Sequence, residues 1–211
     1  MTDITAMKFL KILALCAGSL LSVSADFASE WIEQPLKFTI QSPYDLKQGD
    51  RYMIKDGVYD FVVHKTDQPF QKDSSTLPRT EMRIDNNYKS GSHMFEADVF
   101  VPAGTSGVSI MQIFGGSNGH ASSLQLRVDD GNLMRYHSDT VKSNIYDHWF
   151  HLNVVHDNDT HNIAIFIDGV QVLAAKDFGG SSHYFKCGVY TQEESSDKME
   201  ARFKNIKIYS K

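Results

Sequence analysis

The sequence predicts an all-β domain in which two antiparallel sheets pack face to face as a sandwich. Most segments after residue 35 alternate apolar and polar side chains, which is the pattern of a strand with one buried face. The pairs Asp130-Gly131 and Asp168-Gly169 separate such segments and are typical of hairpin turns. No segment sustains an apolar period of 3.6 residues. Roughly ten to fourteen short strands at this spacing favour a sandwich.

The expected strands follow the alternating segments in chain order. One short helix is allowed around residues 28–34, where the alternation is absent. Pro102 ends one of the strands, because proline cannot continue the hydrogen-bonded ladder. The strands are expected at residues 59–64, 79–84, 94–101, 108–114, 124–128, 133–136, 150–156, 163–167, 185–190 and 203–209.

The first 25 residues have the organisation of a secretory signal peptide. Lys8 and Lys11 lie at the start of an apolar run that continues to Leu21, and Val23-Ser24-Ala25 has the small residues found at cleavage sites. The apolar run is too short for a helix that crosses about 30 Å of hydrocarbon. We therefore expect cleavage near Ala25, a secreted, extracellular protein and one domain over residues 26–211.

Composition excludes several classes of function. The chain has 26 acidic and 21 basic residues, a net charge of −5, and this balance does not indicate a nucleic-acid partner. Of the two cysteines, Cys16 lies in the expected signal peptide, so Cys187 has no partner for an internal disulfide. No metal-ligand spacing and no nucleotide-binding loop is present. We expect no metal, no cofactor and no membrane contact, and we expect a monomer.

A charged face is expected on the segment Arg79 to Ile84. Because strand side chains alternate, Arg79, Glu81 and Arg83 share one face while Met82 and Ile84 point to the core. Adjacent arginines repel each other unless an acid lies between them, and Glu81 can hold both guanidinium groups. The pattern alone is compatible with an anion site or with a solvated sheet face.

Two further segments present polar side chains in the same way. Gln112 and Phe114 share one face of their strand. Lys186 and Tyr190 share one face of another strand, opposite Phe185, Cys187 and Val189. Taken alone, Tyr190 fits a packed aromatic and Lys186 fits a surface charge, so the spacing does not assign either a role.

These three segments together resemble the ordered signatures of the alginate lyase 2 superfamily, which includes the family 7 polysaccharide lyases. The matching blocks are Arg79–Arg83, Gln112–Phe114 and Tyr184–Gln192. Residues 105–114, 144–150 and 182–190 also resemble a eukaryotic branch that contains plant citrate-binding proteins. The resemblance implies a concanavalin-like jelly-roll β-sandwich with a concave sheet as the binding face.

The resemblance also implies a reaction, β-elimination at a uronic acid of an alginate-like or glucuronan-like polymer. Arg83 and Gln112 match positions that neutralise the uronate carboxylate, where charge develops during proton removal. Tyr190 matches the tyrosine that donates a proton to the leaving oxygen. The matching substrate-binding positions are Arg79, Glu81, Lys186 and Gln192.

Phe114 departs from the family pattern, which has histidine at that position. Three hypotheses remain open. Tyr190 acts as both base and acid, or another histidine replaces the lost one, with His64 the first candidate and His120 and His137 weaker ones. In the third hypothesis the site binds an acidic carbohydrate or an organic acid such as citrate without catalysis. The expected partner is an acidic polysaccharide or a carboxylated small molecule.

Overall fold

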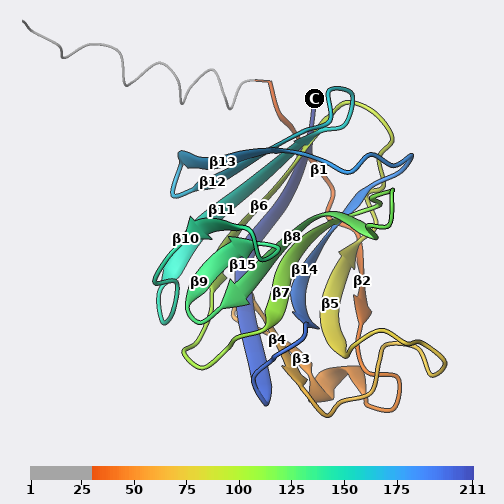
Figure 1. Ribbon diagram of the computed structural model, residues 1–211, viewed down its shortest axis with the longest axis vertical. Coiled ribbons are helices and arrows are strands. Elements are labelled where there is room, and N and C mark those ends of the chain that lie inside the picture. Colours follow the sequence, from red (N-terminus) through yellow and green to blue (C-terminus); the bar gives the residue numbers. More distant parts are fainter. Residues whose placement is uncertain (1–29) are drawn as a thin grey trace, which may run out of the picture. The chain divides into compact units, whose positions relative to one another are not determined.

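The computed structural model describes residues 30–211, and these residues form the predicted all-β sandwich (Figure 1). One sheet has eight strands and the other has seven, and neighbouring strands of the described residues pair antiparallel. The regular helical structure of this part of the chain is one short 3₁₀ turn at Gln48–Asp50. The expected signal peptide and its cleavage near Ala25 lie outside the described residues.

The eight-stranded sheet is built around two long central strands. β1 (Ile32–Gln34) pairs with β15 outside the main path of this sheet. In spatial order the other strands are β13 (Val170–Lys176), β12 (Asn162–Ile167), β11 (Trp149–Asp157), β6 (Ser92–Phe100), β15 (Lys198–Ser210), β4 (Val58–His64) and β3 (Tyr52–Lys55).

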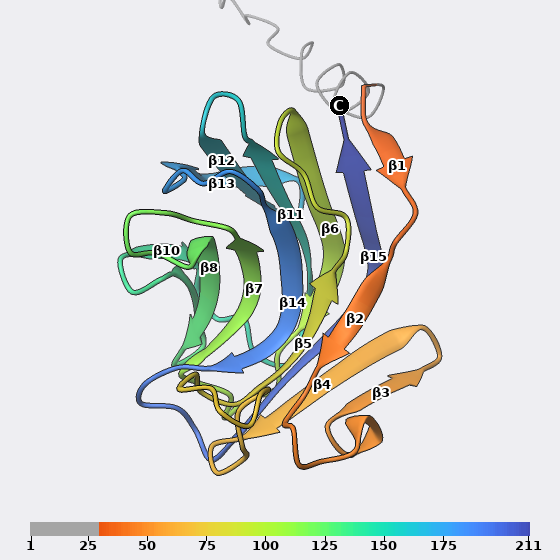
Figure 2. The same ribbon diagram turned by 90° about the vertical axis from the view of Figure 1, so that its right-hand side faces the viewer.

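The seven-stranded sheet curves more strongly (Figure 2). Its strands in spatial order are β10 (Asp139–Lys142), β9 (Asn132–Arg135), β8 (Ser122–Asp129), β7 (Val108–Phe114), β14 (Tyr184–Thr191), β5 (Arg79–Ile84) and β2 (Phe38–Gln41). β14 lies between β7 and β5, although about 70 to 100 residues separate it from them in the chain. Such neighbours are typical of a jelly roll, in which the chain crosses repeatedly between two sheets.

The core lies between the two sheets and is supplied by the predicted inward positions. Phe61 of β4 and Phe203 of β15 meet edge to face with centroids 5.8 Å apart. Phe185 and Cys187 of β14 and Met82 of β5 are fully buried. Since these residues point inward, alternation turns their neighbours Lys186 and Glu81 to the opposite face of the curved sheet.

Several short strands were not expected. The structure has strands β2, β3 and β10 where no strand was predicted, while β13 follows the hairpin turn expected at Asp168-Gly169. The helix expected around residues 28–34 is wrong, because Ile32–Gln34 is strand β1. β1 pairs Ile32 with Ser210 and Gln34 with Ile208. Pairing with the end of β15 satisfies its backbone groups, and this tertiary contact decides the local conformation.

Gly188 is required where β14 passes β5. It lies opposite Glu81 with φ of +133°, and a Cβ there would come within 2.5 Å of the Thr80 carbonyl oxygen. Only glycine tolerates both this dihedral and this approach. The pairing of β14 with β7 also shifts between Cys187 and Tyr190, so the strand bends at this point of the sheet.

Candidate functional site

Three adjacent strands of the curved sheet bring the predicted residues together. Lys186 of β14 pairs with Arg83 of β5 on one side and with Gln112 of β7 on the other. Tyr190 pairs with Arg79, and Tyr184 pairs with Phe114. The three sequence blocks that are far apart in the chain therefore form one continuous patch on the face that points away from the core.

Glu81 lies at the centre of this patch. The residue is 1% exposed, and its carboxylate accepts hydrogen bonds from the ammonium of Lys186 and the amide of Gln112. Arg79 Nη1 reaches the same carboxylate at 3.3 Å. One carboxylate thus faces two cations, so the floor of the site carries an excess of positive charge.

Lys186 is 2% exposed, which is unusual for a lysine. Burial lowers the pKa of its ammonium, the Glu81 carboxylate opposes this shift, and the nearby guanidinium of Arg79 adds to it. The direct ion pair with Glu81 compensates for the loss of water around the ammonium. Because neighbouring charges already shift the pKa of Lys186, a further charge that enters the site will shift it again.

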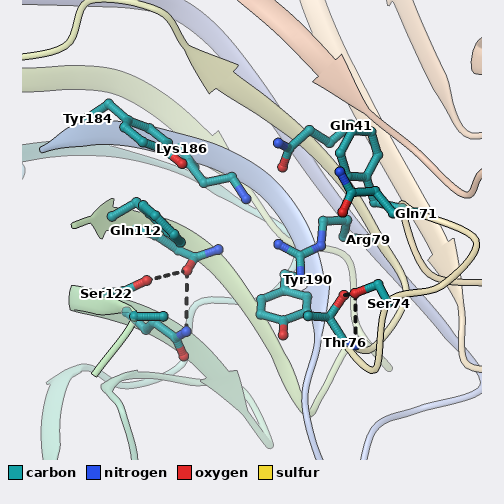
Figure 3. Close-up of a pocket in the computed structure, with 14 residues that line it drawn as sticks. Gln41, Gln71, Ser74, Thr76, Arg79, Gln112, Ser122, Tyr184, Lys186 and Tyr190 are labelled. Atoms are coloured by element: carbon teal, nitrogen blue, oxygen red, sulfur yellow. Dashed lines mark hydrogen bonds between the residues drawn. The ribbon is translucent and has the colours of Figure 1, made fainter. Parts of the chain in front are cut away.

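The amide of Gln112 is held in one orientation. Its oxygen accepts hydrogen bonds from the Ser122 hydroxyl at 2.9 Å and from the Gln125 amide at 3.3 Å (Figure 3). Its nitrogen therefore points to Glu81. This chain of contacts fixes the donor and acceptor ends of Gln112 before any ligand binds.

Aromatic rings complete both ends of the patch. The guanidinium carbon of Arg79 lies 3.8 Å from the ring centroid of Tyr190, a cation–π contact. At the other end Phe114 stacks on Tyr184, with centroids 4.9 Å apart, and Arg83 lies 4.0 Å from the Tyr184 ring centroid. Partial burial raises the pKa of the Tyr184 hydroxyl, and Arg83 partly offsets this rise.

A groove of about 370 Å³ lies over this patch. Figure 3 shows Arg79, Lys186 and Tyr190 pointing into it beside the polar side chains of Gln71, Ser74 and Thr76 from the loop before β5. This loop could not be predicted from the sequence, because its residues follow no period and belong to none of the three blocks. Other lining residues that the sequence did not single out are Gln41, Phe70, Ala121, Ser122 and Gln125, whereas Tyr184 belongs to the third block.

Four of the predicted residues line the groove: Arg79, Gln112, Lys186 and Tyr190. Glu81 lies beneath them.

Arg83 is placed differently from the expectation. Its guanidinium pairs with Asp85 and donates to Asn87 at 3.0 Å, and it does not line the groove. The expectation that Glu81 holds both arginines is therefore wrong for Arg83, because Asp85 is the acid that it meets.

Gln192 and His64 lie away from the groove. The Gln192 amide donates to the backbone carbonyls of Tyr190 and Thr191, and its side chain lines a smaller hollow of about 140 Å³. His64 lies on β4 of the other sheet, where it pairs with Lys198. The structure does not bring His64 to Tyr190.

The two weaker histidine candidates also lie outside the groove. His120 stacks on Phe178 with centroids 3.8 Å apart. His137 bonds to Arg127 and lines the smaller hollow with Gln192. The family's histidine position is held by the phenyl ring of Phe114. None of the lining residues that the structure describes is a histidine, so no imidazole lies in the groove there.

The fold and these blocks define a class of protein. The family model described as alginate lyase matches residues 28–210, so the chain belongs to the alginate lyase 2 family. The alginate lyase AlgAT5 from polysaccharide lyase family 7 is similar in fold, with a TM-score of 0.65, 18% identity, and coverage of 82% of this chain and 94% of that one. The predicted jelly roll is thereby confirmed.

Two further relatives are known with a ligand or by the ligand in their name. A citrate-binding protein of Hevea brasiliensis is 47% identical over 191 residues, covering 88% of this chain and 80% of that protein. A family 7 alginate lyase crystallised with substrate has a TM-score of 0.64 and 16% identity, covering 83% of this chain and 92% of that one. The resemblance to both branches of the family is confirmed.

Among residues 30–211 the structure has no helix with the length and apolar character needed to cross a membrane.

Proposed function

We propose that this chain is an exported protein whose groove binds the carboxylate of an acidic saccharide or of a small organic acid. One observation carries the proposal: Glu81 is shared by Arg79, Lys186 and Gln112, which leaves the floor of the groove with one positive charge in excess. Arg79 lines the groove, so a ligand carboxylate there supplies the missing negative charge and accepts hydrogen bonds from its guanidinium.

The size and lining of the groove agree with such a ligand. Its volume of about 370 Å³ lies within the range of small-molecule sites, roughly 300 to 1,000 Å³. Gln41, Gln71 and Thr76 offer amide and hydroxyl groups for sugar hydroxyls, and the rings of Phe70 and Tyr190 offer apolar surface. The Hevea relative is named a citrate-binding protein, and a related lyase has been crystallised with substrate; both support a carboxylated ligand.

Elimination of a polyuronate is the second candidate, and one observation favours it. Tyr190 lines the groove beside the guanidinium of Arg79, and Gln112 lines the same cavity. A tyrosine can remove the C5 proton and protonate the leaving oxygen when both lie on the same side of the ring. Phe114 weighs against this candidate, because a phenyl ring neither accepts nor donates a proton.

Calorimetric titration distinguishes the two functions. The ligands are citrate and oligomers of mannuronate, guluronate, glucuronate and galacturonate, with a neutral cello-oligosaccharide as control. Each mixture is then followed in the ultraviolet for unsaturated product. Binding of an acidic ligand without product supports the binding function, and product that disappears in Tyr190→Phe supports elimination.

A matched pair of variants locates the binding. Arg79→Gln removes a charge from the groove, and Arg135→Gln removes one from β9, where Arg135 pairs with Asp139. Arg79→Gln is expected to weaken binding and Arg135→Gln to leave it unchanged. If no carboxylated ligand binds, or if both variants behave alike, the groove is not the binding site.

A further inference from the structure

Three side chains that are distant in sequence meet at one end of the sandwich. His156 lies on β11, Asp177 directly follows β13, and His183 directly precedes β14. One ligand atom of each lies within 4.8 Å of the others. Both histidines are fully buried, and the side chain of Asp177 is 1% exposed. No metal site was expected from the sequence, because no metal-ligand spacing is present in it.

His183 is the unusual member of this cluster. Both of its ring nitrogens are buried and make no hydrogen bond of ordinary geometry. The carbonyl groups of Gly180 and Phe114 lie near the ring and favour its protonated form, although burial shifts its pKa downward overall. These carbonyl contacts are poorly aligned, so an ion at one ring nitrogen would give His183 a contact of better geometry than it has now.

His156 and Asp177 are already oriented by their own neighbours. The Nδ1 of His156 bonds to the hydroxyl of Tyr88 at 2.9 Å, and its Nε2 faces Asp177 Oδ2 at 2.8 Å. The other oxygen of Asp177 accepts a hydrogen bond from the backbone N–H of Gly179 at 2.8 Å and lies 3.1 Å from Nδ1 of His161. Metal-binding histidines and carboxylates are normally held in this way, by a second contact on the atom that faces away from the ion.

We propose that His156, Asp177 and His183 bind a zinc ion. Two imidazole nitrogens and one carboxylate oxygen are a donor set that Zn²⁺ takes in proteins, with a fourth position open to water. Bonds of about 2.0 to 2.1 Å hold the ligand atoms of a tetrahedral ion roughly 3.3 Å apart. The cluster reaches this geometry if its most distant ligand atoms approach by up to about 1.5 Å and the His156 and Asp177 atoms separate by about 0.5 Å, so that the ion replaces the direct contact between these two residues.

The zinc ion would join the two sheets. His156 belongs to the eight-stranded sheet, and His183 leads into β14 of the seven-stranded sheet, where Tyr184 is the first residue (Figure 2). The single cysteine in the described part of the chain, Cys187, is free and buried, so no disulfide links the sheets there. A metal ion that binds only the folded chain stabilises it by mass action. The ion would hold the start of β14, next to Tyr184, which lines the groove.

The test uses the whole secreted chain, purified without a histidine tag and stripped of metal with a chelator. It is titrated with ZnCl₂ in a calorimeter and, separately, with CoCl₂ in a spectrometer. We expect one equivalent of bound ion, a visible Co²⁺ absorption typical of four-coordinate nitrogen and oxygen ligands, and a Tm that rises with zinc and falls on chelation. No binding, or a Tm that does not respond, overturns the proposal and leaves the cluster as a buried hydrogen-bonded pair.

Matched variants assign the ion to these residues. His183→Gln and Asp177→Asn each remove one ligand, and His148→Gln removes an exposed histidine that bonds only to the Tyr146 carbonyl. The first two should lose the Co²⁺ absorption and the zinc-dependent rise in Tm, while His148→Gln keeps both. Unchanged Co²⁺ binding in folded His183→Gln or Asp177→Asn places the ion elsewhere and contradicts the proposal.

Discussion

The phenyl ring of Phe114 stacks on the ring of Tyr184, with centroids 4.9 Å apart and planes inclined by 24°. Both rings line the groove, one from β7 and one from β14. Gln112 lies two residues earlier on the same face of β7, so its amide and the Phe114 ring are neighbours there. The stacked pair gives this part of the groove an apolar surface at the position where the family pattern has a histidine.

Phe114→His should restore the missing acid–base group. The imidazole would lie beside Gln112, and general acid–base catalysis typically contributes about 10² to 10⁴ in rate. If the natural protein binds polyuronates without cleaving them, Phe114→His is expected to release unsaturated product at least about 10²-fold above the natural protein. The ultraviolet absorbance of the product measures this gain. Phe114→Leu, which removes the stacking without adding an imidazole, should stay inactive, and equal activity in both variants would contradict the argument.

Arg79→Gln should weaken binding of a carboxylated ligand. A hydrogen bond to a charged group contributes about 1.5 to 3 kcal/mol, which corresponds to a loss of roughly 10- to 100-fold in affinity. Arg83→Gln is the informative control, because the Arg83 guanidinium pairs with Asp85 and Asn87 outside the groove. Calorimetry at low salt should show a small change for this second variant. A larger loss in Arg83→Gln than in Arg79→Gln would mean that the bound state turns Arg83 into the groove.

The faces of β5 and β14 could be predicted from the sequence, because a period of two leaves each side chain only two directions. Which acid each arginine meets could not be predicted from the sequence. Arg83 has Glu81 two residues before it and Asp85 two residues after it, and only the end of β5 brings Asp85 into range. Gln71, Ser74 and Thr76 enter the groove from an irregular loop, for which no period exists.

The short outer strands escaped prediction for a related physical reason. β1 and β3 are three and four residues long, and Ile32, Met53 and Ile54 in them are exposed by half or more of their surface. An alternating pattern needs one buried face, and these strands bury little. The cluster of His156, Asp177 and His183 also depends on contacts between the two sheets, which no local pattern records.

Glu81→Gln should destabilise the fold. The variant leaves the ammonium of Lys186 buried without its carboxylate, and breaking a buried ion pair in this way costs about 3 to 5 kcal/mol. Urea denaturation followed by circular dichroism measures the loss. The double variant Glu81→Gln with Lys186→Met removes the unpaired charge as well and should recover part of the stability. If the double variant is less stable than Glu81→Gln, the cost does not come from the unpaired lysine.

The affinity for a carboxylated ligand should fall at alkaline pH, and the fall should begin below pH 10.5. Burial lowers the pKa of Lys186 from 10.5, with Glu81 opposing and Arg79 adding to the shift. Below this lowered pKa the ammonium is charged and attracts the ligand, and as pH rises through it the charge and its attraction are lost, while the ligand carboxylate stays ionised. Calorimetric titrations from pH 7 upward, within the range where circular dichroism shows an unchanged fold, measure the slope. Lys186→Met should bind more weakly at neutral pH and show no such slope; the same slope in this variant would assign the titration to a different group.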